Sequence, residues 1–481
     1  MVQPFHKQGK KLIGHEYPPA EEARNVEDMI TEMKSQLQKL YPDGGTLRQA
    51  HPKMHGCVHA EFTVESGLPE NLQTGIFKTA STYPCLLRFS NANSKVQADA
   101  KKDIRGMAIK LLNVPGEKLL INEQNATEQD FLLISHNIFV SHNLAEFQKT
   151  IKAVTSGKIL GYFLNPFHWG VLFRTLKSFK VCNHVLDISY WSTTPYQFGD
   201  ITKAVKYHAK PSANQALAYE DTKSADYLRV NLAATLAKQD VYYDFFVQFQ
   251  TDAELMPVED PTVEWKSDFI KCATIKIPKQ VFDTPSQNAL GENLSFTPWH
   301  SLPEHRPIGG INRGRKHAYE AMASFRLERN HVDLKNTAAA IDSKSKNTDM
   351  TNPANEQIVQ QLFTSYLKGD LTGVVALLDP AVVWLEPGSP DIPFAGTFTG
   401  LTNVEKMLGM EGQLLKVTSF VPKAYFSNEN IVIVLGADSA NVLATGKSYS
   451  TDWTMEFTLA NGKIIRVQTF MDTNAIAKAF V

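Results

Sequence analysis

A polar stretch near residue 340 divides the sequence into two segments with different hydrophobic patterns. Between Arg326 and Pro353 the chain reads LERNHVDLKNTAAAIDSKSKNTDMTNP and loses the apolar periodicity of a packed element. Polar stretches of this kind connect domains. The chain has 481 residues, which is enough for two or three hydrophobic cores. We therefore expect a first domain over 1–330, a linker over 331–352 and a second domain over 353–481.

The first segment contains short runs that are typical of β-strands separated by turns. These runs are CVHAEFTV, YPCLLRFS, RGMAIKLL, HVLDISYWS, VYYDFFVQFQ and FIKCATIKIP. Together with a few helical stretches they predict an antiparallel β-barrel with appended helices. The most apolar run, GYFLNPFHWGVLF at 161–173, is short and is interrupted by Pro166 and His168. We expect it to be a buried or cavity-lining element.

The second segment has the pattern of a small α+β unit. NEQIVQQLFTSYLKGDLTGVVALL predicts amphipathic helix, whereas VVWLEP, NIVIVLGAD and YSTDWTMEFTLANGKIIRVQTFMD predict strands, with a tight turn at ANGK. Side chains alternate between the two faces of a strand, so Trp384 and Glu386 share one face.

Charge and cysteine usage exclude several classes of protein. The chain has 49 Lys and Arg against 50 Asp and Glu, a net charge of −1, which gives no electrostatic reason for a nucleic-acid partner or an anionic membrane. Its four cysteines lie far apart without metal-ligand spacing, as buried thiols in a reducing compartment do. No apolar run follows the basic N-terminus or approaches the length of a membrane span. We expect a cytoplasmic protein with no stable membrane insertion.

The stretch GGINRGRKHAYEAMASFRLER places Arg315, Tyr319 and Arg326 on one face of a predicted helix, at offsets of four and eleven residues. One interpretation is a solvated helix whose arginines pair with acids such as Glu320 and Glu328. The other is that Arg315 holds Tyr319 as a phenolate, because a cation one turn away favours the ionised phenol. A buried phenolate in turn needs a metal ion.

Three further motifs lie upstream of this helix. TLRQAHPKMHGCVHAEFTV places Arg48 three residues before His51, directly ahead of a predicted strand. LLRFSNANSKVQADAKKDIRGMAIKLL supplies Arg88, Ser90 and Arg105, and EQDFLLISHNIFVSHN is an apolar run that ends in polar residues. A single histidine before a strand is more often a surface or capping residue than a catalytic one. Taken singly, each motif indicates little.

In this order along the chain, the motifs resemble the haem catalase superfamily, specifically its shorter catalase-related branch, which includes catalase-like allene oxide synthases and small peroxidases. The resemblance covers roughly the first two thirds of the chain and implies haem b as cofactor, with Tyr319 as the axial ligand of ferric iron. Arginines suit the two haem propionates, because guanidinium offers forked donors to carboxylates. The implied cofactor-binding residues are Arg48, Arg88, Arg105, Phe139, Arg315 and Arg326.

The resemblance also implies catalytic roles. His51 is the general base for a bound hydroperoxide, and Ser90 fixes its tautomer. The family's distal asparagine comes five residues after the aspartate of a DFLLVN-type run, and counting from Asp130 that position is Ser135, with Asn137 in place of the family's proline. A serine hydroxyl is shorter than a carboxamide. The sequence therefore predicts weak dismutation of hydrogen peroxide and a roomy cavity that suits an organic hydroperoxide, unless Asn137 or a water substitutes.

The second segment resembles the SnoaL-like group of the ketosteroid isomerase cone fold, through its helix and strand order, VVWLEPGS, FAGTFTGLTNVEKML and the final FMDT. Members of this group include polyketide cyclases, isomerases and an epoxide hydrolase. Asp472 lies where such cones place an inward acid, so Trp384, Glu386 and Asp472 are pocket candidates. The alternative is a dimerisation cone whose charges face outward.

Three functions stay open at this point. The first is a haem enzyme that isomerises or dehydrates a fatty-acyl hydroperoxide, with a C-terminal cone that handles the product or makes a homodimer. The second is a catalase or peroxidase that detoxifies hydrogen peroxide. The third is a non-catalytic haem-binding protein, against which His51 and Ser90 argue, because a haem carrier needs neither.

Overall fold

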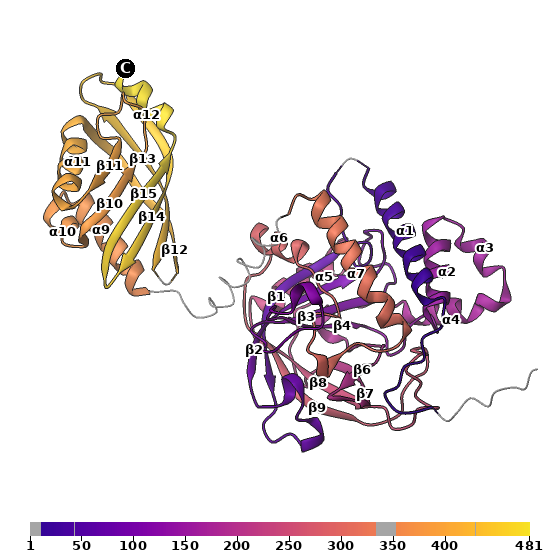
Figure 1. Ribbon diagram of the computed structural model, residues 1–481. Helices are drawn as coiled ribbons and strands as arrows, with labels where there is room; N and C mark the ends of the chain where they lie inside the picture. The colour runs from indigo at the N-terminus through magenta and orange to yellow at the C-terminus, as the bar shows by residue number, and fades with distance from the viewer. Residues whose placement is uncertain (1–10, 43, 333–352, 429) are drawn as a thin grey trace, which may run out of the picture. The chain divides into compact units, whose positions relative to one another are not determined.

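The computed structural model describes residues 11–42, 44–332, 353–428 and 430–481 (Figure 1). The chain divides into two compact units, one up to residue 341 and one from residue 342. Of the linker expected over 331–352, only His331 and Val332 are described, and the rest of that prediction lies outside the described residues.

The N-terminal unit is built on a closed antiparallel barrel, which confirms the predicted fold. Its sheet runs in the order β5-β4-β3-β2-β1-β9-β8-β7-β6, and β5 also pairs with β7, so eight strands close on themselves while β6 lies at the edge. The strands are β1 (Met54–Val64), β2 (Thr82–Asn91), β3 (Arg105–Leu111), β4 (Gln129–Ile134), β5 (Tyr190–Trp191), β6 (Tyr196–Phe198), β7 (Asp200–Pro211), β8 (Val241–Phe249) and β9 (Phe269–Ile277).

Two strands differ from the sequence prediction. The run at 184–192 is strand only at β5, because it begins with a 3-10 turn capped by the His184 side chain. The long strand β7 was not predicted, since the centre of DITKAVKYHAKP is buried on both faces and carries lysines, so it lacks a period of two.

Aromatic side chains fill the barrel interior. The ring of Phe131 lies 6.2 Å from that of Phe62 and 5.1 Å from that of Phe245. Such packing buries large apolar areas and favours offset and edge contacts. Because Phe131 points into the barrel, the residues on either side of it in β4 point outward.

Seven α-helices and six 3-10 turns surround the barrel in the described part of this unit. The helices are α1 (Glu22–Leu40), α2 (Leu144–Thr155), α3 (Ile159–Phe163), α4 (Trp169–Ser178), α5 (Tyr227–Leu236), α6 (Pro285–Asn293) and α7 (Gly310–Arg329). The turns are η1 (Glu70–Leu72), η2 (Gly75–Phe77), η3 (Ile121–Glu123), η4 (Pro166–His168), η5 (Val185–Asp187) and η6 (Pro303–His305). Helix α1 packs against both α2 and α7, and α2, α3 and α4 form a lobe beyond α1 (Figure 1).

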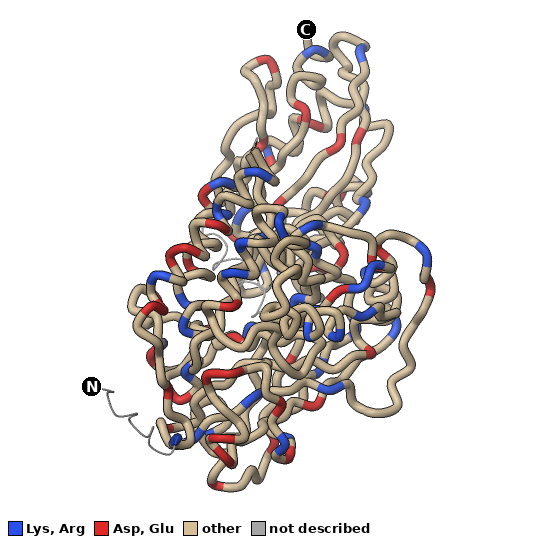
Figure 2. Tube along the Cα trace, turned by 90° about the vertical axis from the view of Figure 1, so that its right-hand side faces the viewer, with Lys and Arg blue, Asp and Glu red and all other residues tan. Residues whose placement is uncertain are grey.

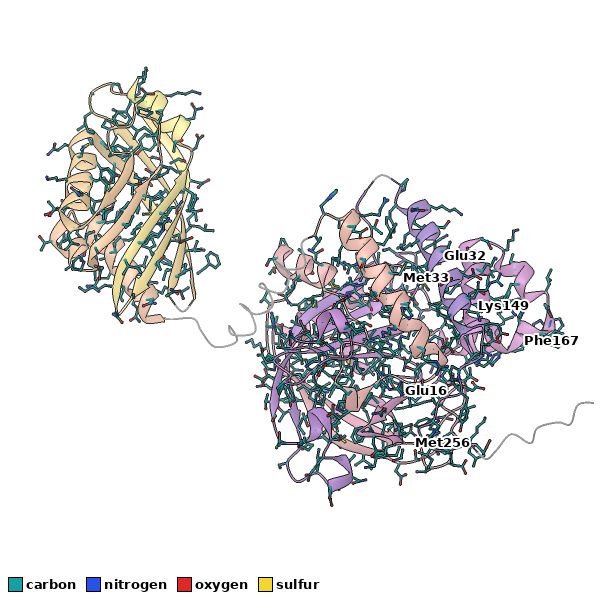
Figure 3. The ribbon with its side chains drawn as sticks, viewed as in Figure 1. Glu16, Glu32, Met33, Lys149, Phe167 and Met256 are labelled. Atoms are coloured by element: carbon teal, nitrogen blue, oxygen red, sulfur yellow. The ribbon has the colours of Figure 1, made fainter. Side chains whose placement is uncertain are left out.

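The apolar run at 161–173 lies at the surface of this lobe, so the prediction of a buried element is wrong. Leu164 is 82% exposed and Phe167 is 90% exposed. Figure 3 shows Phe167 at the outer edge of the lobe. The run breaks into the short elements α3, η4 and the start of α4, which bury Val171 but leave most of their other apolar side chains uncovered.

The C-terminal unit is an α+β cone, as predicted. Its six-stranded sheet has the order β11-β10-β15-β14-β13-β12, in which β10 and β15 pair in parallel and the other neighbours antiparallel. The elements are α9 (Pro353–Leu367), α10 (Leu371–Val375), β10 (Leu378–Glu386), β11 (Gly396–Thr399), α11 (Leu401–Leu414), β12 (Leu415–Asn428), β13 (Ile431–Val442), β14 (Ser448–Ala460), β15 (Lys463–Met471) and α12 (Thr473–Phe480).

None of the four cysteines forms a disulfide bond, and Cys57, Cys85 and Cys272 are buried. Among the described helices, none has both the length and the apolar character that a membrane span requires.

Candidate functional site

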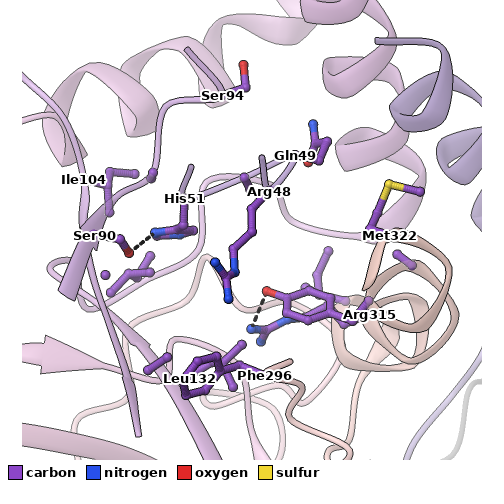
Figure 4. Close-up of a pocket in the computed structure, with 18 of the residues that line it drawn as sticks. Arg48, Gln49, His51, Ser90, Ser94, Ile104, Leu132, Phe296, Arg315 and Met322 are labelled. Carbon is purple, nitrogen blue, oxygen red and sulfur yellow. Dashed lines mark hydrogen bonds between the residues drawn. The ribbon is translucent and has the colours of Figure 1, made fainter. Parts of the chain in front are cut away.

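The N-terminal unit contains a cavity of about 450 Å³ between the outside of the barrel and helices α1, α2 and α7 (Figure 4). This volume lies within the range of small-molecule and cofactor sites, roughly 300–1,000 Å³. One face of α7 forms part of the wall, because residues three and four apart lie above one another on a helix. That face consists of Ile311, Arg315, Ala318, Tyr319, Met322, Ala323 and Arg326.

Arg315 is fixed against the phenol of Tyr319. Its Nη2 donates a hydrogen bond of 3.2 Å to the Tyr319 oxygen, drawn as a dashed line in Figure 4, and its Nη1 donates to Asn312 at 3.1 Å. Burial lowers the pKa of Arg315, but the neighbouring tyrosine hydroxyls outweigh it and the net direction is upward, so the guanidinium stays charged. Among the described residues, Arg315 bonds Thr194, Asn312 and Tyr319, and Arg326 bonds two backbone carbonyls, so neither pairs with Glu320 or Glu328. The Tyr319 oxygen therefore lies next to a guanidinium that stays positively charged.

His51 lies in the same cavity, three residues before β1. Its Nδ1 is 2.9 Å from the Ser90 hydroxyl (Figure 4). The backbone of His51 has a φ of 61°, a left-handed conformation that is rare for residues other than glycine and that often marks functional sites. Gly106 on β3 makes room for the ring, since a Cβ there would lie 2.5 Å from Cε1 of His51. The glycine of the RG motif is thus required by contact with the histidine.

The His51 imidazole is neutral over the physiological range. Burial lowers its pKa to about 3, with a further contribution from the guanidiniums of Arg88, Arg315 and Arg48. A neutral imidazole has one ring nitrogen that accepts a hydrogen bond and one that donates. If Nδ1 donates to Ser90, Nε2 is free to accept a proton.

Three arginines, Arg48, Arg88 and Arg326, line one end of the cavity, and the first two pair with the carboxylate of Glu292. Glu292 lies 3.0 Å from Nη1 of Arg48 and 3.4 Å from Nη2 of Arg88, while Arg326 donates to the Leu294 carbonyl at 3.1 Å. Three guanidiniums and one carboxylate leave an excess of two positive charges, and burial lowers the pKa of each arginine. Nε of Arg88 has no hydrogen-bond partner among the described residues. This end of the cavity is suited to a group with two carboxylates.

Ser135 and Asn137 lie outside the cavity, so the prediction that they face it is wrong. The Ser135 hydroxyl accepts a hydrogen bond of 2.8 Å from the backbone N–H of Arg105, and the Asn137 amide donates to Glu264 at 2.6 Å. The sequence argument assumed that Ser135 continues the alternation of Phe131. That face of β4 is the barrel interior, and β4 ends at Ile134.

The residues of β4 that line the cavity are Leu132, Leu133 and Ile134. Ile134, directly before Ser135, is the last residue of β4 and lies at the cavity wall. Like serine it carries no carboxamide, and it has no hydrogen-bond donor at all.

Arg105 also lies away from the cavity, contrary to its predicted role with the cofactor. Its guanidinium donates to the side chain of Asn91 and, at 3.0 Å, to the carbonyl of Asp99. The alternation of β3 explains this, because Gly106 faces His51 and Arg105 points to the opposite side. Phe139 does line the cavity, where its ring packs 5.2 Å from that of Phe147.

Apolar residues of α1 and α2 form a large part of the wall that the sequence argument missed. They are Met29, Met33, Leu144, Phe147 and Ile151. Each set has helical spacing, which predicts a buried face but does not say whether that face meets a core or a cavity. Only the packing of α1 against α2 and α7 brings them to the site.

A smaller cavity of about 80 Å³ lies in the C-terminal unit. Glu386 lines it, accepting hydrogen bonds from Trp384 at 3.2 Å and from Thr469 at 2.9 Å. Burial raises the pKa of Glu386 to about 7 and that of Asp438 to about 6. Burial also raises the pKa of Glu411. Asp438 and Glu411 were not predicted as cavity residues, because they come from β13 and α11, far from Glu386 in the chain.

Asp472 is not part of this cavity, and its prediction as a pocket acid is wrong. Its carboxylate caps the last helix, α12, by accepting from the backbone N–H groups of Asn474 at 3.1 Å and Ala475 at 3.2 Å. An aspartate directly before a helix commonly takes this role.

Comparisons with known proteins agree with the two folds. Residues 359–467 match the family model of the SnoaL-like domain. An NTF2-like protein from Burkholderia xenovorans LB400 is 26% identical over 27% of this chain and 99% of its own, with a TM-score of 0.26. A fungal catalase is 16% identical over 67% of this chain and 66% of its own, with a TM-score of 0.47. Catalase A from Saccharomyces cerevisiae is 17% identical over 67% of this chain and 68% of its own, with a TM-score of 0.49.

No curated protein matches the chain. The family-model match lies within the C-terminal unit. The chain spans about two thirds of the length of these catalases. At such identities the likeness concerns the fold, so the chemistry must be argued from the residues of the site.

Proposed function

We propose that the N-terminal unit is a haem-dependent enzyme that isomerises or dehydrates an organic, fatty-acyl hydroperoxide. One observation carries this proposal: a single cavity holds both the His51 and Ser90 pair and the Arg315 and Tyr319 pair. The first pair suits proton transfer, and the second suits an anionic metal ligand.

The residues fit a b-type haem. Tyr319 would bind its iron through the phenol oxygen, which accepts a hydrogen bond from Arg315. The excess of two positive charges at Arg48, Arg88 and Arg326 matches two propionates, and the free Nε of Arg88 offers one more donor. When bound, haem supplies a ferric iron that can cleave the O–O bond of a hydroperoxide.

The chain itself would handle the proton. Nε2 of His51 accepts the proton of the hydroperoxide O–H group and returns it to the leaving oxygen. For this, Nδ1 must carry the other ring proton and donate it to the Ser90 hydroxyl, which fixes the tautomer and the orientation of the ring. Dehydration releases one water per hydroperoxide and isomerisation releases nothing, so neither needs an external reductant.

The apolar wall supports an organic substrate over hydrogen peroxide. Met29, Met33, Phe147 and Ile151 offer a surface for an acyl chain, and Ile134 offers no donor to a small peroxide. Ala50, beside His51, also lines the cavity and leaves more space than a larger side chain would.

The proposal is tested by adding hydrogen peroxide and a fatty acid hydroperoxide separately to the purified protein. We expect loss of the conjugated diene absorbance of the lipid, with little oxygen release from hydrogen peroxide. Rapid oxygen release with no lipid turnover would instead support a catalase. Binding of haem with neither activity would support a non-catalytic haem protein.

Replacing Ile134 with asparagine should shift the enzyme toward hydrogen peroxide. Ile134→Asn adds a carboxamide to the cavity wall, so we expect a several-fold rise in oxygen evolution and a fall in turnover of the fatty acid hydroperoxide. Loss of stability alone would lower both activities. Ser135→Asn is the matched control and should leave the ratio of the two activities unchanged, because that side chain lies outside the cavity. Equal effects of the two variants would contradict the assignment of Ile134.

We further propose that the C-terminal cone handles the product of the first unit, with dimerisation as the alternative role. Its cavity combines aromatic walls with carboxyl groups whose pKa values are raised. A carboxylic acid that keeps its proton near neutral pH can donate it to an epoxide or carbonyl oxygen.

The raised pKa of Glu386 predicts that the C-terminal unit loses stability as pH rises. The folded state keeps this proton up to about pH 7, whereas the unfolded chain releases it near the ordinary value of 4.5. The folded state binds more protons in this window, so stability falls between these pH values, by on the order of 3 kcal/mol for this one group. Glu386→Gln should remove the contribution of this group, while the raised pKa values of Asp438 and Glu411 leave a residual fall.

Hydrogen exchange of β10 and β14 in the full chain would measure this effect. Comparing Glu386→Gln with the wild type at each pH cancels the intrinsic pH dependence of exchange. Asp472→Asn is the control, and it should leave the pH dependence in place. A wild-type protein whose protection is constant from pH 4.5 to 7 would contradict the prediction.

A further inference from the structure

The lobe formed by α2, α3, η4 and α4 exposes apolar side chains that the peroxide chemistry does not use. Six of them are between 47% and 90% exposed: Leu160, Leu164, Phe167, Trp169, Phe173 and Leu176. We call these six residues the lobe patch. Four-residue spacing places the two leucines of the α3 region on one side, and likewise Trp169 and Phe173 on α4. Clustered exposed apolar groups, unlike scattered ones, mark an interaction surface.

The same lobe is strongly basic. Residues 144–181 contain six basic residues and one acid, a net charge of +5 in a chain whose total is −1. The acid, Glu146, is paired with Arg174 at 3.1 Å. The other five basic residues are exposed lysines, of which Lys152 lies 3.9 Å from Glu32 of α1. These are Lys149, Lys152, Lys158, Lys177 and Lys180. Figure 2 views the chain from the side on which Figure 1 draws the lobe, with basic positions in blue, and Figure 3 labels Lys149 beside Phe167 on the lobe.

The cavity of the N-terminal unit opens next to this lobe. Val154, at the end of α2, lines the cavity and is also 44% exposed, so the cavity meets the surface there. Phe147 and Ile151 continue the apolar wall inward along α2, and Phe179, just after α4, lines the cavity as well. An apolar path therefore runs from the foot of the lobe to the site.

We propose that the lobe docks on the surface of an anionic phospholipid bilayer. The lobe patch inserts among the acyl chains just below the headgroups, with Trp169 at the boundary, and the lysines contact the anionic headgroups. The charge pattern favours a bilayer over a purely apolar protein partner, because the lobe carries five exposed lysines and its one acid is paired with Arg174. A lipid substrate would then pass from the bilayer to the cavity without crossing water. The docking surface lies outside the haem cavity and does not rest on the proposed function.

Co-sedimentation of the full-length protein with vesicles tests the proposal. We expect binding to vesicles of phosphatidylcholine and phosphatidylserine, weaker binding to pure phosphatidylcholine, and weakening by salt. The double variant Leu164→Ser/Phe167→Ser should bind at least about tenfold more weakly to both kinds of vesicle. It loses the favourable free energy of burying two large apolar side chains in the bilayer. The affinity of the triple variant Lys149→Gln/Lys158→Gln/Lys177→Gln should fall roughly tenfold or more for the anionic vesicles and should not change for pure phosphatidylcholine.

The matched control is Leu255→Ser/Val281→Ser, which removes two apolar residues of similar exposure, 71% and 80%, from elsewhere on the unit. It should bind vesicles like the wild type, and so should Tyr319→Phe, which separates docking from haem chemistry. Absence of wild-type binding, or equal loss in the Leu255/Val281 control, would overturn the proposal. The proposal would also be overturned if sedimentation velocity showed a dimer for the wild type and a monomer for the Leu164/Phe167 variant. The lobe patch would then be a subunit interface.

Discussion

Replacing Tyr319 with phenylalanine should leave the purified protein almost without haem. The variant removes the oxygen that would bind iron, and the cavity supplies no equivalent anionic ligand on the α7 face, whose described members are otherwise Arg315, Arg326 and apolar residues. The lost oxygen is the one that Arg315 contacts at 3.2 Å. The measurement is the ratio of haem absorbance to protein absorbance after reconstitution, which we expect to fall to near background.

Two comparisons make this test specific. Tyr243→Phe removes another buried hydroxyl, one that donates to the Val185 carbonyl inside the barrel, and should keep full haem occupancy. The thermal unfolding temperature of both variants in the absence of haem should stay close to that of the wild type. A Tyr319→Phe protein with a wild-type ferric spectrum would show that the ligand is a different residue.

Replacing His51 should abolish turnover of hydroperoxides while leaving haem bound. We expect His51→Ala to lower the rate by at least about two orders of magnitude, as is typical when a general acid–base group is removed. Haem occupancy should persist, because the arginines and Tyr319 are untouched. Initial rates of diene loss and haem content, measured on the same preparation, check both parts of the prediction.

The other histidines of this region provide the control. His55 is hydrogen-bonded to the Asn91 side chain, and His136 is hydrogen-bonded to the carbonyl of Ile138. Neither histidine lines the cavity. His136→Ala should therefore retain most of the activity. A third variant, Ser90→Ala, should show an intermediate loss in kcat with little change in KM, because Ser90 orients His51 and does not bind the substrate. An active His51→Ala enzyme would contradict the assignment of the base.

Local sequence signals were sufficient where a role depends on one element. The spacing of Arg315, Tyr319 and Arg326 on α7 follows from the helical repeat alone, and the structure brings these residues to one cavity wall. The same holds for Trp384 and Glu386, which lie two residues apart on one face of β10. The Trp384 indole N–H donates a hydrogen bond to the Glu386 carboxylate. In each case the backbone period determines which side chains lie together.

The sequence by itself determined the two fold types and the grouping of residues along each helix or strand, because hydrophobic period and turn chemistry are local properties. Only the tertiary structure decided which side of a strand or helix meets a cavity. It placed Ile134 at the wall and Ser135 behind it, because one face of β4 is the barrel interior. It brought Glu411 and Asp438 to Glu386 from different elements, and it left Phe167 uncovered. These outcomes depend on which elements pack together, and that packing joins residues far apart in the chain.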